Sequence, residues 1–316
     1  WTTTPWTVPA NRAIACGKNI EYSLLEVEKN ESNDIINNGQ KLLIASVLIN
    51  NFIETVNIKE INILGKFKGL DLAKTVCSHP LESQGYDFEV PILIGDFVST
   101  DQGTGFVHVA PSHGEDDFNL GKKYNLPMPE MVGDAGVYNS NVPLFAGIHV
   151  FKASQPICEA LSNSKSLLAS ESYKHSYPHS WRSKKPVIFR ATKQWFISME
   201  KDNLRKKALK AIENTFWVPS VSKNRIKSMV KDRPDWCVSR QRIWGVPITV
   251  FIYKDSAEIL RDKKVNERIA RAVEEKGADV WFTEDPKTFL GDKYNINDFI
   301  QIQDILDVWF DSGSTH

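Results

Sequence analysis

The chain has 316 residues, of which 41% are hydrophobic and 25% are charged, enough apolar side chain for two domains or one elaborate one. This composition excludes a disordered, collagen-like or coiled-coil protein. No run of about 18 apolar residues occurs, so no membrane-spanning segment is predicted. The four cysteines are far apart and include no C-x-x-C pair. They favour a reducing compartment, the cytoplasm, over a disulfide scaffold or a zinc ribbon.

The formal net charge is zero, with 39 basic and 39 acidic residues, but the charges are unevenly placed. Between Lys152 and Arg242 the sequence has 20 Lys and Arg residues but only 7 Asp and Glu residues. Aromatic residues are interleaved with this basic block, a pattern that favours contact with a polyanion. A solvated, lysine-rich helix surface is the alternative. The chain opens at Trp1 inside a predicted strand, without a secretory or transit segment, so we expect it to be part of something longer.

The predicted elements up to about residue 165 are mainly strands. Alternating or short apolar runs predict strands, and apolar spacing of three and four residues predicts helices. The strands are expected at 13–28 (two), 60–67, 88–99 and 106–110, and the helices at 41–56, from about Glu115 and at 152–164. No regular alternation of strand and helix appears in this part, and residues 126–147, rich in Pro and Gly, are predicted to be loops.

The remaining part has predicted helices at 204–215 and at 266–276, the second ending at Gly277 and followed by a strand. Residues 235–253 are predicted to pass from a turn into a strand, and 307–314 to be a strand that runs into a turn of small residues. The fold class is therefore mixed α/β.

The chain begins with Trp-Thr-Thr-Thr-Pro-Trp-Thr, which places the hydroxyls of Thr2, Thr3 and Thr4 beside a rigid turn. Hydroxyls both donate and accept hydrogen bonds, so such a group can bind a ribose, a carbonyl and a water together. An ordinary β-branched strand is the alternative.

A second group of polar residues lies in GTGFVHVAPSHGEDDF, residues 103–118. One interpretation is a phosphate-binding loop, although a third glycine and a Gly-Lys-Ser/Thr element are absent. Another is a metal site using His108, His113, Asp116 and Asp117, although the spacing matches no common pattern. The third is a hydrolytic pocket with an imidazole on a strand and a carboxylate at a helix start. A simple turn with a capping carboxylate is the alternative to all three.

Two further stretches combine aromatic and basic residues. YPHSWRSKKPVIFRATKQWF (177–196) suits phosphate contact and base stacking, or else forms a solvated basic hairpin. RPDWCVSRQRIWGVPI (233–248) and DVWFDSGS (307–314) each place a tryptophan beside a tight turn, where tryptophan more often belongs to the core than to a ligand site.

Together and in this order, these motifs resemble isoleucyl-tRNA synthetase, a class I aminoacyl-tRNA synthetase with an inserted editing domain. The resemblance covers the entire chain: residues 1–11 and 103–118 match the two editing motifs of the family. Valyl and leucyl relatives have an arginine in the first motif, where Thr4 stands here, and Trp6 follows Pro5. Phe106 departs from the family pattern, in which alanine is common, and we expect it only to alter the packing behind the pocket.

The resemblance implies hydrolysis of valine mis-attached to tRNA(Ile), with valyl-adenylate as a second candidate substrate. It implies that Asp117 pairs with the substrate ammonium, that Thr2, Thr3 and Thr4 surround the ester, and that His108 excludes isoleucine. Further substrate contacts are expected from Trp1, Trp6, Thr7, Gly103, Gly105 and His113, and tRNA contacts from Lys184, Lys185 and Arg190.

The resemblance also implies an organisation in three parts. A β-barrel-like editing domain is expected over 1–165, a basic return segment over 166–245, and a second insertion with a partial, Rossmann-type α/β piece over 246–316. The His-x-Gly-His and Lys-Met-Ser-Lys-Ser elements that activate amino acids in this class are absent from the sequence. We therefore expect no metal or cofactor in this chain, ATP and Mg²⁺ in the parent enzyme, and Trp244 and Trp309 in structural roles.

Expected partners are the acceptor end of tRNA(Ile) carrying valine and the rest of the parent synthetase. A monomer without membrane contact is expected. Two alternatives stay open: an RNA-binding or scaffolding module whose pocket is inactive in isolation, and a divalent-metal hydrolase.

Overall fold

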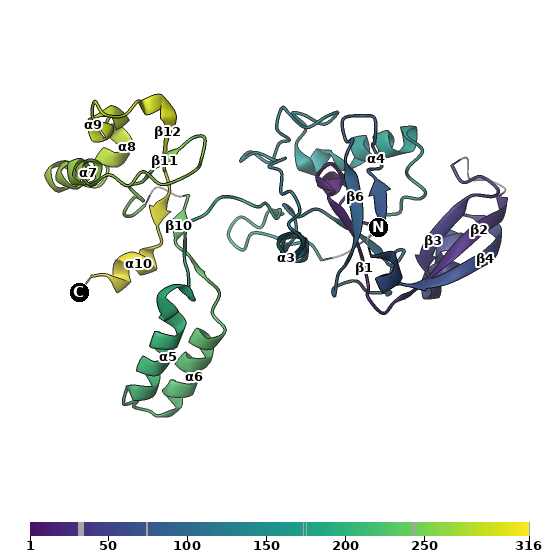
Figure 1. The fold of residues 1–316 in the computed structure, drawn as a ribbon, viewed down its shortest axis with the longest axis horizontal. Coiled ribbons are helices and arrows are strands. Elements are labelled where there is room, and N and C mark those ends of the chain that lie inside the picture. The colour runs from purple at the N-terminus through teal and green to yellow at the C-terminus, as the bar shows by residue number, and fades with distance from the viewer. Residues whose placement is uncertain (31–34, 74, 173, 175, 242–243, 316) are drawn as a thin grey trace. The chain divides into compact units, whose positions relative to one another are not determined.

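The structure, a computed structural model, describes residues 1–30, 35–73, 75–172, 174, 176–241 and 244–315. The chain forms two compact units, Trp1–Thr192 and Lys193–His316 (Figure 1). Both contain helices and strands, so the mixed α/β class is confirmed. None of the described helices has the length and hydrophobicity needed to cross a bilayer.

The centre of the first unit is a four-stranded sheet with the order β5-β6-β1-β7. Its strands are β1 (Ala13–Cys16), β5 (Val76–Ser78), β6 (Glu89–Ile94) and β7 (Phe106–Val109). Strand β1 pairs parallel with β6 and antiparallel with β7. Its sequence, Ala-Ile-Ala-Cys, is wholly apolar because the strand is central and covered on both sides.

A second sheet in this unit has three antiparallel strands in the order β3-β2-β4. These are β2 (Glu21–Asn30), β3 (Lys41–Ala45) and β4 (Ile58–Lys68), which form a separate layer (Figure 1). The helix predicted over 41–56 is wrong at its start, because residues 41–45 pair with β2. The rest of that range forms the 3-10 turn η2 (Ser46–Leu48) and helix α1 (Ile49–Thr55).

The predicted barrel is wrong: within the described residues the two sheets stay separate and open. Closure would require the edge strands β5 and β7 to pair with each other. They have only three and four residues and lie at opposite edges of the sheet. Among the described residues the longest strands, β2 and β4, belong to the other sheet. Its core around Tyr22, Leu25 and Val27 is shared with Cys16 of β1 and Ile92 of β6, so the two sheets pack together without closing into a barrel.

The helices of the first unit cover the central sheet and fix its loops. They are η1 (Pro5–Ala10), α2 (Gly69–Leu72), α3 (Glu115–Tyr124), η3 (Val150–Lys152) and α4 (Ser154–Asn163). The helices predicted near Glu115 and over 152–164 are confirmed, as are the strands predicted in 13–28, 60–67, 88–99 and 106–110. Trp6 and Val8 of η1 pack with Tyr86, Tyr138 and Ile157 in one buried cluster, which holds the start of the chain in place.

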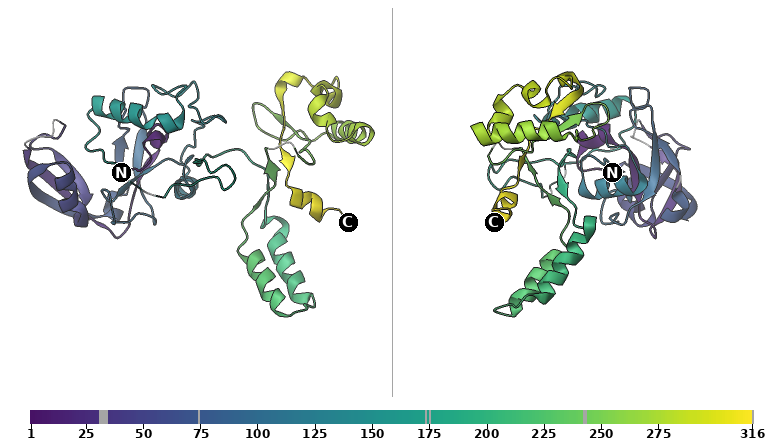
Figure 2. Two further views of the ribbon diagram at one scale, coloured as in Figure 1. Left: turned by 180° about the vertical axis from the view of Figure 1, so that it is seen from behind. Right: turned by 60° about the vertical axis from the view of Figure 1, so that its left-hand side comes forward.

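The second unit begins with a helical hairpin. Helices α5 (Leu204–Asn214) and α6 (Val221–Lys231) pack against each other and project from the rest of the unit (Figure 2). The 3-10 turn η4 (Lys201–Asn203) precedes them. The helix predicted over 204–215 is confirmed.

The rest of the second unit consists of strand pairs and short helices. The strands are β8 (Phe196–Ile197), β9 (Trp236–Cys237), β10 (Ser239–Arg240), β11 (Phe251–Tyr253), β12 (Phe299–Gln301) and β13 (Ile305–Leu306). They pair antiparallel as β8-β9, β10-β13 and β11-β12. The predicted Rossmann-type piece is therefore not formed by the described residues, whose strands in this unit include no parallel pair.

The remaining elements of this unit are α7 (Lys263–Lys276), α8 (Val280–Thr283), α9 (Pro286–Leu290), η5 (Ile296–Asp298) and α10 (Val308–Gly313). Gly277 ends α7 as predicted. The strand predicted after it is helix α8, whose Trp281 is fully buried against Phe251 and Phe289. The strand and turn predicted at 307–314 are wrong, because the Asp307 carboxylate caps helix α10.

Candidate active site

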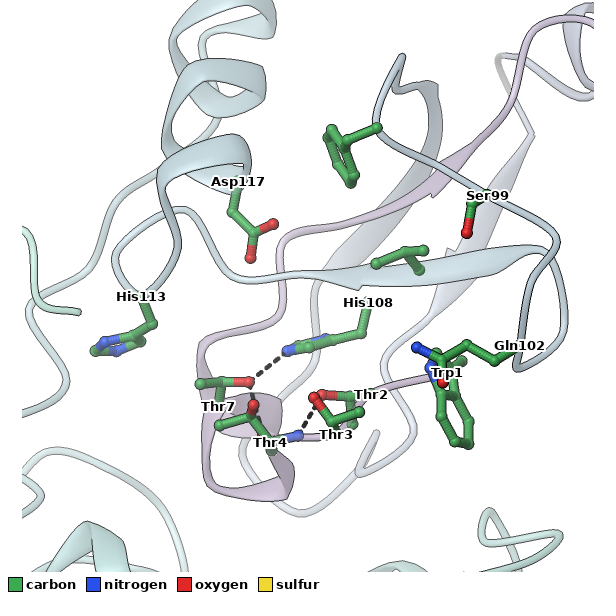
Figure 3. Close-up of a pocket in the computed structure, with 12 residues that line it drawn as sticks. Trp1, Thr2, Thr3, Thr4, Thr7, Ser99, Gln102, His108, His113 and Asp117 are labelled. Carbon is green, nitrogen blue, oxygen red and sulfur yellow. Dashed lines mark hydrogen bonds between the residues drawn. The ribbon is translucent and has the colours of Figure 1, made fainter. Parts of the chain in front are cut away.

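A cavity of about 340 Å³ in the first unit brings the two polar motifs together (Figure 3). It lies between the start of the chain, the loop that precedes β7, β7 itself and the start of α3. Its lining residues are Trp1, Thr2, Thr3, Thr4, Thr7, Phe97, Ser99, Gln102, Val107, His108, His113 and Asp117.

Strand pairing places the two motifs side by side. In the register of β1 with β7, Ile14 is opposite His108. The pairing extends toward the chain start, where the His108 backbone N–H donates to the Trp1 carbonyl at 3.1 Å and Arg12 donates to Val109 at 2.9 Å. Residues about 100 positions apart therefore share one cavity wall.

The threonine loop is held by its own hydrogen bonds. The Thr2 hydroxyl accepts from the Thr4 backbone N–H at 3.0 Å, and the Thr7 hydroxyl donates to the Thr4 carbonyl at 2.9 Å. Pro5 then begins η1, and its fixed φ suits a first helical position. Thr3 is exposed and lines the cavity.

His108 is a neutral wall of the cavity. The Asn11 amide donates to the Ala13 carbonyl at 3.1 Å and to the His108 Nδ1 atom. The Ala13 carbonyl can only accept, which fixes the amide orientation, so Nδ1 carries a lone pair and Nε2 carries the proton. That proton is donated to the Thr7 hydroxyl, 2.9 Å away. Burial lowers the pKa of His108 to about 3, so the ring is uncharged at neutral pH.

Asp117 is the carboxylate of the cavity lining. It lies in the first turn of α3, and its Oδ2 atom accepts from the Ala110 backbone N–H at 2.9 Å. Its carboxylate points into the cavity, toward His108 (Figure 3). Burial raises the pKa of Asp117 to about 6. A cation bound beside it would reverse this shift, because an opposite charge favours the ionised form.

His113 anchors a later segment to the cavity wall. Its Nδ1–H donates to the Phe189 carbonyl at 3.0 Å, and its ring packs edge-on against Trp6 at 4.9 Å. Figure 3 shows the ring turned away from Asp117 and His108. Its Nε2 atom is buried without a hydrogen-bond partner, and burial lowers the pKa of the ring. In this conformation the imidazole is a packing group, and a substrate contact by it stays a prediction.

Gly103 and Gly105 permit close backbone approach. Both have positive φ, +77° and +76°, which side chains strongly disfavour. A Cβ at Gly103 would lie 2.5 Å from the Trp1 ring, and one at Gly105 would lie 2.4 Å from the Ala45 side chain. Gly103 therefore lets Trp1 close one end of the cavity, while Gly105 joins β7 to the second sheet.

The residues predicted to contact tRNA lie outside the cavity lining. Lys184 and Lys185 are exposed. Arg190 is already engaged, since its guanidinium donates to the Val132 carbonyl at 3.2 Å and pairs with Asp134.

The geometry does not favour the metal-site interpretation of residues 108–117. Among the described residues no three His, Cys, Asp or Glu side chains gather closely enough to share a metal ion.

Sequence reasoning missed five residues of this site. Asn11 sits at the end of the first motif, and its role depends on a contact with His108 that no local pattern reveals. The other four line the cavity from the loop before β7 and from β7 itself: Phe97, Ser99, Gln102 and Val107. Their proximity to Gly103 and Gly105 in the sequence is the one signal that could have identified them.

The family model described as tRNA synthetases class I (I, L, M and V) matches residues 6–316. The chain belongs to this family. It is 50% identical over 328 residues to the isoleucine–tRNA ligase of Gluconobacter oxydans and 51% identical over 316 residues to that of Pelagibacter ubique. Each match covers 100% of this chain but 34% of the relative, so the chain spans about a third of the length of these relatives.

Among solved structures, the editing domain of the cytosolic leucyl-tRNA synthetase of P. knowlesi matches with a TM-score of 0.40 and 13% identity. This match covers 54% of the chain and 82% of that domain. The corresponding domain from P. falciparum matches with a TM-score of 0.40 and 15% identity, over 54% and 78%. Similarity at this level does not by itself establish a shared fold.

Replacement of Asn11 by Asp should change the protonation of His108. A carboxylate can only accept, so Nδ1 would have to carry a proton, and the adjacent negative charge would favour the charged imidazole. We expect the pKa of His108 to rise from about 3 by two units or more, measured by NMR of ¹⁵N-labelled histidine. Asn11→Ala, which adds no charge, should leave it low. An unchanged His108 titration in Asn11→Asp would contradict the assigned network.

Proposed function

We propose that this chain hydrolyses the ester joining valine to the terminal ribose of tRNA(Ile). The observation that supports this most is the cavity itself, in which one half-buried carboxylate, a loop of threonine hydroxyls and a neutral imidazole face the same space. Membership of the class I tRNA synthetases and the high identity to isoleucine–tRNA ligases supply the substrate class.

Such a reaction is needed because a single hydrophobic pocket distinguishes valine from isoleucine only weakly. Valine and isoleucine differ by one methylene, which a hydrophobic pocket distinguishes by only about 1–3 kcal/mol, or roughly 10–200-fold. A second site that accepts valine and excludes isoleucine multiplies this selectivity.

In the proposed mechanism, ionised Asp117 pairs with the α-ammonium of the attached amino acid. Its raised pKa in the empty cavity reflects burial without a cation, and the ammonium supplies the missing charge. The hydroxyls of Thr2, Thr3 and Thr4 surround the ester and the ribose. Water adds to the ester carbonyl, and free valine and the ribose hydroxyl are the products.

No side chain of the cavity is well placed as a general base. Both ring nitrogens of His108 are engaged, by Asn11 and Thr7, and its pKa is low. The free nitrogen of His113 is sealed from solvent. We therefore assign the orientation of the attacking water to a hydroxyl of the terminal ribose, with hydrogen-bond donors of the threonine loop facing the carbonyl oxygen. The proposed hydrolysis uses no metal or cofactor.

We propose further that the chain works within a longer cytoplasmic, monomeric isoleucine–tRNA ligase, which attaches isoleucine with ATP and Mg²⁺. This chain lacks the His-x-Gly-His and Lys-Met-Ser-Lys-Ser elements that this step uses. Its residues therefore do not fit an ATP site, and the proposed hydrolysis has no step that uses ATP. Its proposed partners are the acceptor end of tRNA(Ile) and the rest of the synthetase.

Asp117→Ala should abolish deacylation of valyl-tRNA(Ile). Loss of one partner of a buried charge pair costs about 2–5 kcal/mol, so we expect the rate to fall by at least about 30-fold. The assay incubates the purified chain with valyl-tRNA(Ile) and measures loss of the ester.

Asp116→Asn is the matched control, because Asp116 is an exposed carboxylate on the same turn of α3 and lies outside the cavity lining. Near-normal activity of Asp117→Ala would remove Asp117 from the mechanism. RNA binding without any ester hydrolysis by the unaltered chain would favour the scaffolding alternative. Loss of hydrolysis in a strong chelator would favour a metal hydrolase.

His108→Ala should widen the substrate range. Removal of the imidazole enlarges the cavity wall, so we expect isoleucyl-tRNA(Ile) to be hydrolysed at a rate within about ten-fold of valyl-tRNA(Ile), compared by initial rates of ester loss. His149→Ala is the control, since His149 lies outside the cavity lining. If His108→Ala leaves isoleucyl-tRNA(Ile) intact, His108 does not exclude isoleucine.

A further inference from the structure

Residues 178–187 form a short hairpin in the first unit. Val187 N–H donates to the Pro178 carbonyl at 3.0 Å, and Ser180 N–H donates to the Lys185 carbonyl at 2.9 Å. The turn is closed by the Lys184 N–H, which donates to the Ser180 carbonyl at 2.8 Å. Lys184 itself has a positive φ of 56°. The tip of the hairpin is therefore a defined turn held by backbone hydrogen bonds.

The tip presents one aromatic ring and three positive charges to solvent. The Trp181 side chain is 77% exposed, and the Arg182 guanidinium lies 5.1 Å from its ring centre. Arg182, Lys184 and Lys185 are exposed, and no ion pair of the described residues engages them. The sequence between Glu171 and Glu200 has no acidic residue, so the flanking chain supplies no carboxylate to these cations.

The stem that follows the hairpin is fastened to the wall of the cavity. The Phe189 carbonyl accepts from His113, and Ala191 N–H donates to the Ser112 carbonyl at 2.8 Å. Lys185 is four residues before Phe189, at most about 13 Å of extended chain. The base of the hairpin is therefore tied to His113, a residue of the cavity lining.

The chemistry of the tip fits RNA better than protein. Unpaired bases stack on exposed aromatic rings, and arginine beside the ring adds a cation–π contribution. Lysines supply the phosphate contacts of single-stranded nucleic acid. Protein interfaces are also rich in tryptophan and arginine, but they are depleted in lysine, and two lysines stand at this tip.

We propose that the 178–187 hairpin binds the unpaired nucleotides at the 3′ end of the RNA substrate. Trp181 stacks on a base, and Arg182, Lys184 and Lys185 face the adjoining phosphates. This inference rests on the proposed function, since it assigns a contact surface to the same RNA, but it concerns binding and not ester hydrolysis.

The test measures affinity for an uncharged RNA hairpin that ends in the four unpaired nucleotides of a tRNA acceptor end, by fluorescence anisotropy of a label on its loop. Trp181→Ala in the full 316-residue chain should weaken binding about 5- to 150-fold, the range that loss of one stacked base gives. Trp181→Phe, which keeps an aromatic face, should retain most of the affinity. Removal of the unpaired tail from the RNA should abolish the difference between Trp181→Ala and the unaltered chain.

Trp309→Ala is the matched control, because Trp309 is 72% exposed but lies in the second unit, and it should bind like the unaltered chain. The double variant Lys184→Ala/Lys185→Ala should reduce the slope of log K against log salt by about 1.4, since each phosphate contact to a single strand contributes about 0.7. Equal affinities of Trp181→Ala and Trp309→Ala would overturn the proposal and leave Trp181 as a contact for protein.

Asp117→Ala separates this proposal from the proposed function. It should lose ester hydrolysis but bind the uncharged RNA with unchanged affinity. If hydrolysis is absent from the unaltered chain while the effect of Trp181→Ala on binding persists, the proposed function fails and the RNA surface stands.

Discussion

The antiparallel pairing of β1 with β7 is the constraint on which the site depends. Its register, with Ile14 opposite His108, aligns the threonine loop with the strand that leads to Asp117. Backbone hydrogen bonds alone would leave the side chains free to rotate. The hydrogen bonds of Asn11 and Thr7 to the two ring nitrogens of His108 remove that freedom. The cavity is therefore shaped before any ligand binds, and a preformed cavity lowers the entropic cost of binding.

The electrostatics of the cavity follow from burial. The imidazole of His108 stays neutral, while Asp117 has a pKa of about 6 and is ionised at neutral pH at a cost in desolvation. In the proposed function, the ammonium of the substrate offsets this desolvation cost at the half-buried carboxylate. In the proposed function, the charge of Asp117 selects an amino-acid ester, and the uncharged wall at His108 selects its side chain by size. The 178–187 hairpin, with Trp181 exposed, is proposed to bind the RNA at a surface separate from the cavity.

Sequence reasoning succeeded where the signal was local. The two motifs, helix α3 and the short strand β7 each depend on neighbouring residues, and all four were predicted. It failed where distant pairing decides: residues 41–45 have helical spacing but form β3, because β2 offers a partner strand. The barrel that the family resemblance implies was also wrong, because its closure depends on which strand edges pair, and the described sheets stay open. Asn11 was missed because its role depends on the hydrogen bond of its amide to His108, 97 residues away in the sequence. At Val308–Gly313, the capping carboxylate of Asp307 outweighed the strand-like pattern.

The most direct test of the central claim is an NMR titration of the Asp117 carboxyl group with and without a non-hydrolysable amide of valine and 3′-amino-3′-deoxyadenosine. The free protein should titrate near 6, and the analogue should lower this pKa by more than one unit, because its ammonium lies beside the carboxylate. The matched analogue in which the α-amino group of valine is replaced by hydrogen should not lower it. Equal titration curves with the two analogues would contradict the account.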